Sequence, residues 1–215
     1  MKIQPVIYKC PNCSSLIRGM KYLSGNTIGG VLYSDSYLEA PMNIPEGSNY
    51  LGCPQCQKVF LKNDLPMVKE YAVGDEELTE WEQVLAPLDW FATLKILLED
   101  PKFNEPSNQK KFTLWYLWYF NHKLSPLEKQ NEIKNGNYKK YTDRLIDILE
   151  QEQDGQEPLV LTIEILRERG DFDKALELIN QLDLKAFPPI FQLVLTENKN
   201  KALQKDPEVF LVARN

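Results

Sequence analysis

Four cysteines occur among the 215 residues, and they form two identical short motifs. Two residues separate Cys10 from Cys13, and two residues separate Cys53 from Cys56. Random placement would scatter four thiols along the chain, whereas each Cys-x-x-Cys turn presents two sulfurs to one tetrahedral ion. The spacing therefore predicts a single metal site whose ligands are Cys10, Cys13, Cys53 and Cys56.

Zinc in a structural role is the metal that this ligand set favours, because four protein thiolates leave no coordination position for water or substrate. Iron remains an alternative, since ligand softness does not separate it from zinc. A reversible dithiol is a further alternative. Neither cysteine pair, however, lies between a strand and a helix, which is where thioredoxin-like motifs occur.

Composition places the chain among ordinary folded proteins, with 43% hydrophobic and 26% charged residues. Its length permits one large domain or two smaller ones. A formal net charge of −6 argues against generic attraction to nucleic acids or anionic membranes. Residues 1–66 carry six basic and four acidic side chains, so zinc with four thiolates would bring this region close to neutrality. We therefore expect a protein partner rather than a nucleic acid.

The first nine residues lack the continuous apolar stretch of a secretory signal. The chain also contains no run of about 18 apolar residues that could span a membrane. We therefore expect a cytoplasmic protein, and in that reducing compartment Cys-x-x-Cys pairs bind metals more often than they form disulfides.

Residues 1–66 have the composition of short strands and turns. The expected strands lie at residues 5–9, 31–33, 37–40, 49–51 and 58–61. Small polar residues and glycines fill the spacer at 24–36, which is typical of a hairpin turn. A recognition surface near the metal is the other interpretation of this spacer.

After Pro66 the pattern becomes helical, with an acidic helix start or linker at residues 75–80. The expected helices lie near residues 87–98, 111–120, 138–152, 158–169, 171–182 and 190–197. Pro87 is expected to begin the first helix, and Ser107 to cap the second. The sequence thus predicts an α+β protein, with a β-rich domain at 1–66 and an all-α domain of helical hairpins at 67–215.

The cysteine region resembles a zinc ribbon, including those of uncharacterised bacterial proteins. The resemblance rests on the two cysteine knuckles and the strand-like segments between them. Ser14 and Gln57 stand where such knuckles often carry glycine. The Cys-Pro-x-Cys form of both knuckles, with Tyr50 before the second, is also similar to rubredoxins, which implies iron-based electron transfer as an alternative.

One helical connection resembles a single tetratricopeptide-type hairpin. Gly170 would end the first helix, Asp171 would cap the next, Phe172 would wedge between them, and Ala175 would permit close packing. The chain departs from the family pattern at Ile163 and Phe187. The resemblance implies repeat-like hairpins that contact other proteins.

No catalytic pattern emerges from the other residues. His122 is the single histidine, so a triad or a histidine-based metal site has no second candidate, and we expect it to stabilise a helix C-terminus. The aromatic run at 115–120, together with Trp81 and Trp90, is expected to lie in the core. No acidic pair lies in an apolar pattern that would raise its pKa.

The sequence therefore predicts a zinc-binding protein-interaction or adaptor module that is not an enzyme. Nucleic-acid binding through the ribbon is the alternative function, followed by rubredoxin-like electron transfer. The oligomeric state is not determined by the sequence.

Overall fold

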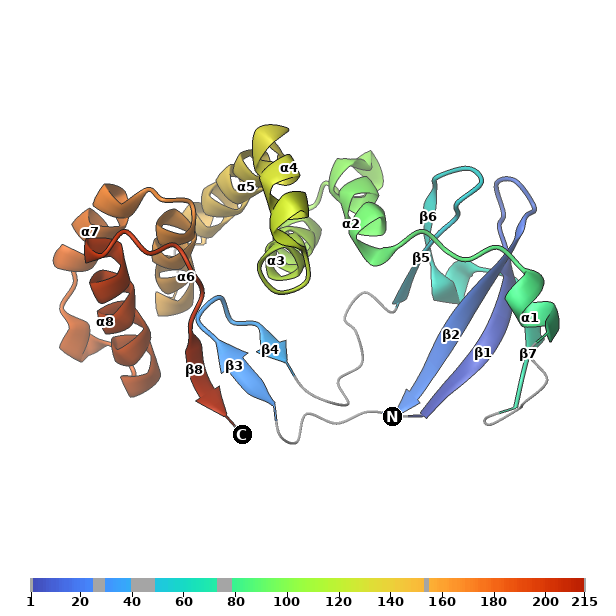
Figure 1. Cartoon of the computed structure of the whole chain (residues 1–215), viewed down its shortest axis with the longest axis horizontal. Helices are drawn as coiled ribbons and strands as arrows, with labels where there is room; N and C mark the ends of the chain where they lie inside the picture. The colour runs from blue at the N-terminus through green and yellow to red at the C-terminus, as the bar shows by residue number, and fades with distance from the viewer. Residues whose placement is uncertain (1, 25–29, 40–48, 73–78, 153–154, 215) are drawn as a thin grey trace. The chain divides into compact units, whose positions relative to one another are not determined.

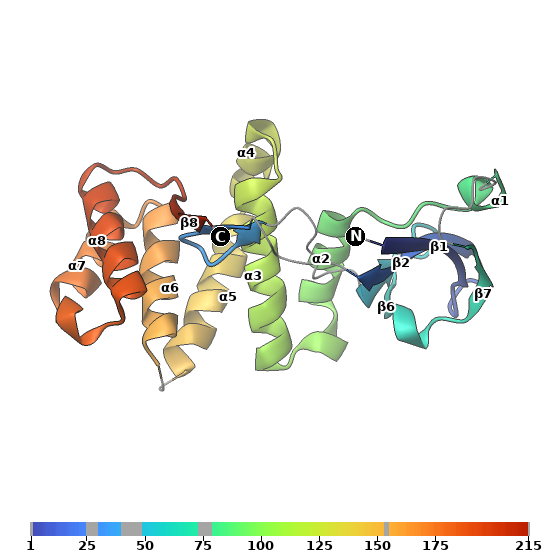
Figure 2. The same cartoon turned by 90° about the horizontal axis from the view of Figure 1, so that it is seen from below.

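The computed structural model describes residues 2–24, 30–39, 49–72, 79–152 and 155–214. Short strands dominate the N-terminal part and helices the rest, which confirms the predicted α+β class (Figures 1 and 2). The contacts of the chain group it into two compact units. The first comprises residues 1–30 and 39–104, and the second comprises residues 31–38 and 105–215.

The first unit is built from antiparallel strands. Its strands are β1 (Lys2–Lys9), β2 (Leu16–Ser24), β5 (Tyr50–Gly52), β6 (Val59–Leu61) and β7 (Met67–Glu70). One sheet has the order β2-β1-β7, and a separate hairpin pairs β5 with β6. Val6, Ile17 and Leu51 are buried in a common core that also contains Cys10 and Cys53. The strands therefore carry the cysteines into the interior of this unit.

Strand β7 lies where the sequence predicted the start of the helical region. It pairs with β1, so that Val6 faces Glu70, and the Lys9 N–H donates to the Pro66 carbonyl at 2.9 Å. Helices α1 (Thr79–Gln83) and α2 (Trp90–Glu99) also group with the first unit. The expected division at Pro66 stays a prediction, but the contacts of the chain group residues 67–104 with the strands that carry the cysteines.

Two predicted helix starts are wrong. Helix α2 begins at Trp90 instead of Pro87, because the Asp89 carboxylate accepts the Ala92 N–H at 2.8 Å and caps the helix there. The next helix has Pro106 in its first turn, ahead of Ser107, so Ser107 does not cap it.

The second unit is mainly helical. Its helices are α3 (Pro106–His122), α4 (Pro126–Lys134), α5 (Asn137–Gln151), α6 (Gln156–Glu168), α7 (Phe172–Asn180) and α8 (Pro189–Leu203). Helix α5 packs against α3 and α6, and α6 contacts both α7 and α8. Every residue from 160 to 168 is buried, so α6 is the central helix of the unit. Within the described residues, every helix is too short or too polar to cross a lipid bilayer.

The α6–α7 connection forms the helical hairpin that the sequence predicted. Gly170 has a φ of 82°, a left-handed conformation that ends α6, and Ala175 is fully buried. Asp171 is the N-cap residue of α7, as predicted. Its side chain accepts no capping hydrogen bond and instead pairs with Arg169 at 3.1 Å.

Part of the cysteine spacer belongs to the helical unit. Strands β3 (Val31–Tyr33) and β4 (Leu38–Glu39) join β8 (Leu211–Arg214) in a sheet of order β4-β3-β8. Ser34 and Asp35 form the turn after β3 and are almost fully buried, so the turn interpretation holds here and an open recognition surface does not. Residues 25–29 of the spacer lie outside the described residues.

Asp35 is held by three side chains of α3. Its carbonyl accepts the Trp118 indole N–H at 2.7 Å, and its Oδ2 accepts the Asn121 amide at 3.0 Å. The His122 Nε2 lies 2.9 Å from the same Oδ2. His122 also stacks on Tyr37, with ring centroids 4.3 Å apart. The expectation that His122 serves mainly its own helix end is therefore corrected: it is part of a buried polar cluster.

The sequence pattern gave no indication of the buried carboxylates of this cluster. Glu164 and Glu168 follow each other by one turn of α6, and both are buried together with Asp35. Burial raises the pKa of Glu168 well above its ordinary value of 4.5, and the charges of Glu164 and Asp35 raise it further. Asn121 and Arg167 act in the opposite direction. Ionised Glu168 therefore destabilises the fold.

Replacing Glu168 with glutamine tests this assignment. A carboxyl group whose pKa is higher in the folded than in the unfolded state does not change the stability below pH ~4.5, because it is protonated in both states. As pH rises above ~4.5, the group lowers the free energy of unfolding progressively, because it ionises more easily in the unfolded chain. Glu168→Gln cannot ionise, yet it keeps an acceptor for the Asn121 amide. We expect its free energy of unfolding to exceed the wild-type value by at least about 1 kcal/mol at pH 7.5 and to match it near pH 4. Urea titrations at both pH values measure the difference, and an equal gain at both would contradict the assignment.

Candidate metal centre

Two turns of the same design position the cysteines. The first knuckle joins β1 to β2, and the second joins β5 to β6. In the first, the Ser14 N–H donates to the Cys10 carbonyl and the Cys10 N–H donates to the Ser15 carbonyl, at 2.9 and 2.8 Å. In the second, the Gln57 N–H donates to the Cys53 carbonyl at 2.9 Å. Each hairpin thus closes around its cysteine pair.

Ser14 and Gln57 adopt left-handed conformations, with φ values of 63° and 53°. These are the two positions where similar knuckles often carry glycine, so the sequence correctly identified the demanding points of both turns. A non-glycine residue in this region costs about 1–2 kcal/mol. Hydrogen bonds that close the knuckles offset part of this cost.

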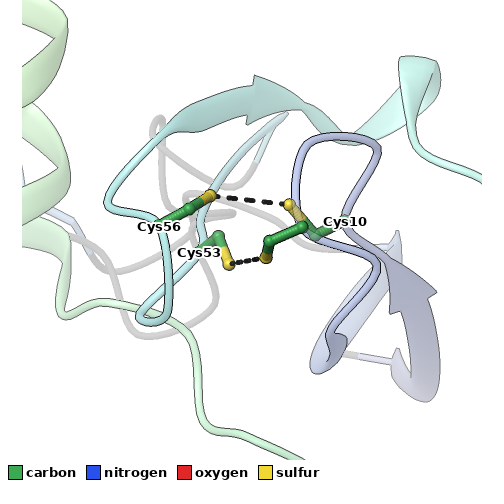
Figure 3. A group of neighbouring side chains, drawn as sticks. Cys10, Cys53 and Cys56 are labelled. Carbon is green, nitrogen blue, oxygen red and sulfur yellow. Dashed lines mark hydrogen bonds between the residues drawn. The ribbon is translucent and has the colours of Figure 1, made fainter.

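The four sulfurs converge on one point. Cys10 Sγ lies 3.7 Å from Cys56 Sγ, and Cys13 Sγ lies 3.6 Å from Cys53 Sγ. All four Sγ atoms are within 4.8 Å of one another, and Figure 3 shows Cys10, Cys53 and Cys56 directed toward a common centre. Tetrahedral Zn–S bonds of about 2.3 Å place sulfurs about 3.8 Å apart, whereas a disulfide brings them to about 2.0 Å. The spacing fits a tetrahedral metal ion and not two disulfides.

Burial differs between the members of each pair. Cys10 and Cys53, the first cysteine of each knuckle, are fully buried, whereas Cys13 and Cys56 are partly exposed. The buried pair packs with the apolar core of the first unit. A metal bound here would tie the two hairpins together from inside that core.

The pKa values of the thiols also differ between the buried and the partly exposed cysteines. The Ser15 hydroxyl lies 3.3 Å from Cys13 Sγ, and its hydrogen bond lowers the pKa of Cys13 to about 6. Burial raises the pKa of Cys53 to about 12 and also raises that of Cys10, although backbone N–H groups of each knuckle oppose the change. Metal binding to the four sulfurs therefore requires proton release, including release from the buried Cys10 and Cys53, whose thiol form is favoured by burial.

Ser15 was not among the residues selected from the sequence. Its only signal was a hydroxyl placed two residues after a ligand cysteine, which is too common to identify a site. The four predicted ligands, in contrast, lie together and could hold one metal ion. The identity of that metal stays a prediction. No protein-family model, curated protein or solved structure matches this chain.

Proposed function

We propose that the protein is a zinc-stabilised protein-interaction module, in which the metal is structural and the helical unit supplies the contact surface. The observation that supports this proposal most strongly is that four sulfurs, two from each knuckle, lie within 4.8 Å of one another. Four thiolates complete a tetrahedral zinc shell, so no coordination position is left for a substrate. This donor set supports a scaffold instead of a catalytic metal.

Helix α8 is the element on which we place the contact surface. It follows the α6–α7 hairpin and contacts both of those helices. Ile190 and Leu193 on α8 are 42% and 52% exposed, and their three-residue separation places them on one side of the helix. In the proposal, these two side chains form part of a larger apolar patch of the kind that a partner protein covers.

Partner capture tests this proposal with matched variants of the full chain. Wild type, Ile190→Lys/Leu193→Lys and Leu203→Lys are tagged and used for affinity purification with mass spectrometry from the native cells. Leu203 is also exposed on α8 but lies on a different side of the helix, so Leu203→Lys is the control. We expect a reproducible partner with wild type and with the control, reduced at least tenfold by the double variant. Recovery of no reproducible partner would count against the adaptor function, and an unaffected partner would exclude this face of α8.

A further inference from the structure

The first unit contains a cavity that the metal centre does not use. Its volume is about 420 Å³, and β2, β5 and the segment leading into α2 supply most of its lining. This volume falls within the roughly 300–1,000 Å³ of small-molecule sites in proteins. All of the lining residues belong to the same compact unit.

Backbone hydrogen bonds fix the walls of this cavity. The Arg18 N–H of β2 donates to the Leu85 carbonyl at 2.9 Å, and the Leu88 N–H donates to the Gly52 carbonyl of β5 at 3.0 Å. The segment at 85–88 therefore links the two strands. A side chain at Gly52 would clash, because its Cβ would lie 2.8 Å from the Leu88 Cβ. The cavity is thus a built feature of the fold.

Aromatic side chains line much of the cavity. They are Tyr22, Tyr50, Trp81 and Trp90. The sequence pattern predicts that both tryptophans lie in the core, but in the structure each remains partly exposed. The Trp81 indole N–H donates to the Gly19 carbonyl at 3.3 Å, which satisfies its polar atom. Such a lining favours a planar apolar ring.

Among the described residues that line the cavity, the charged ones are two bases, Arg18 and Lys62. The Arg18 guanidinium lies 4.9 Å from the centre of the Trp81 ring. Lys62 Nζ donates to the Met20 carbonyl at 3.1 Å and lies 5.6 Å from the Tyr22 ring. Within the described part of the chain, neither base forms an ion pair with a carboxylate.

The described residues supply no acidic partner at this site, although the chain as a whole has 31 acidic and 25 basic residues. A partly buried cation without a counterion is destabilising, and an anion would remove that cost. A guanidinium held over an aromatic ring can still bind a carboxylate or phosphate. The aromatic lining and the two bases, which have no carboxylate partner in the described ranges, therefore define complementary halves of one site.

We propose that this cavity binds a small planar aromatic anion, with its ring among the aromatic side chains and its carboxylate or phosphate held by Lys62 and Arg18. Such a ligand could be an aromatic acid or a nucleotide, which share this chemistry. The site is separate in function from the structural metal, although both depend on the same fold.

Burial lowers the pKa of Lys62 to about 8. Lys62 is therefore mainly charged at pH 7 and mainly neutral at pH 9. An anion is attracted only to the charged form, so its affinity falls as pH rises through 8. Arg18, Tyr22 and Tyr50 are the other titratable groups that line the cavity. Loss of the pH dependence in a Lys62 variant would identify Lys62 as its source.

Isothermal titration calorimetry of the zinc-loaded full chain tests the proposal with two pairs of probes. Indole-3-acetate is compared with the neutral indole-3-ethanol, and adenosine 5′-monophosphate with adenosine. We expect at least one anion to bind at least tenfold more tightly than its neutral counterpart at pH 7. The pair that shows the difference tells whether the site prefers a carboxylate or a phosphate. Equal affinity within both pairs, or no binding of any probe at millimolar concentration, would overturn the proposal.

Variants assign the effect to the cavity. Lys62→Gln is expected to reduce the preference for the anion to less than threefold and to remove its decline between pH 7 and pH 9. Lys21→Gln is the control, because Lys21 is an exposed lysine of β2 that pairs with Glu70 at 2.8 Å outside the cavity. If Lys62→Gln does not fold, as judged by circular dichroism and zinc content, Arg18→Gln replaces it. A preference that survives in the folded variant would place the anion elsewhere.

Discussion

Replacing Cys53 with serine is expected to unfold the first unit and to leave the helices of the second unit folded. Structural zinc contributes about 10–16 kcal/mol to folding in small zinc domains, which is comparable with the total stability of a typical domain. Cys53 is fully buried within the core that joins the two hairpins. A serine there loses a ligand and leaves a polar hydroxyl in an apolar setting.

The second unit has its own core, and it should therefore stay folded in the Cys53→Ser variant. Phe112, Tyr116 and Leu145 are fully buried among its helices. Residues 31–38 group with these helices even though they lie between the two knuckles in the sequence. We expect the circular dichroism at 222 nm to decrease only slightly, because most of the helices belong to the second unit.

The measurement combines elemental analysis with far-ultraviolet circular dichroism and amide dispersion in nuclear magnetic resonance spectra. Wild type should contain one zinc per chain and show no visible absorption, whereas bound iron would replace zinc and colour the protein. Gln55→Ser is the matched control, since Gln55 is an exposed, non-ligand residue of the same knuckle. Full zinc occupancy in Cys53→Ser would contradict the four-cysteine site. Collapse of the whole helical signal would show that the two units depend on one another.

Replacing Arg167 with leucine is expected to destabilise the second unit by about 3–5 kcal/mol. Arg167 is fully buried on α6, and its Nη2 lies 2.7 Å from Glu164 Oε1. Its other N–H groups donate to Asn198 Oδ1 at 2.7 Å and to the carbonyls of Asp206 and Glu208 at 2.8 and 2.9 Å. Leucine removes all of these bonds at once and leaves the Glu164 carboxylate buried without its cation.

The loss of stability in Arg167→Leu should extend beyond helix α6. Ser34 donates its hydroxyl to the same Glu164 oxygen, and the Phe210 N–H donates to Ser34 Oγ at 3.2 Å. Arg167 therefore stabilises both the spacer turn and the segment that leads into β8. We expect hydrogen exchange in these two segments to accelerate more than in α3.

A double-mutant cycle separates the ion pair from the remaining contacts. Glu164→Gln keeps an acceptor for Ser34 but removes the charge. In the presence of Glu164→Gln, the cost of Arg167→Leu should fall by at least about 1 kcal/mol, because no uncompensated charge remains. Urea titration followed at 222 nm measures all four proteins. A cost below about 1 kcal/mol for Arg167→Leu alone would show that the ion pair does not stabilise the fold.

Local patterns in the sequence predicted much of this architecture. The cysteine spacing selected the four side chains that converge, and the positions of Ser14 and Gln57 marked the left-handed turns. Gly170 correctly marked the end of α6, because a left-handed residue after a helix is a local requirement. These features depend on a few neighbouring residues, so a pattern can identify them.

Strands β2, β7 and β8 and helix α4 were not predicted. Strands β7 and β8 are short, and each forms only by pairing with a distant strand. β7 pairs with β1, and β8 pairs with β3 of the spacer. The partners lie roughly 60 and 180 residues away in the sequence, which no local pattern records. For the same reason the burial of Asp35 against α3 and the exposure of Trp81 could not be predicted.

The sequence alone determined which four side chains can share a metal, because two short motifs with a fixed spacing contain all of its thiols. Only the tertiary structure decided where the rest of the chemistry lies. It brings the acidic spacer turn into contact with α6 and gathers aromatic and basic residues around a cavity in the cysteine unit. The physical reason is that each cysteine pair is positioned by its own local turn, whereas burial, strand pairing, cavities and the meeting of the two knuckles depend on contacts between residues far apart in the chain.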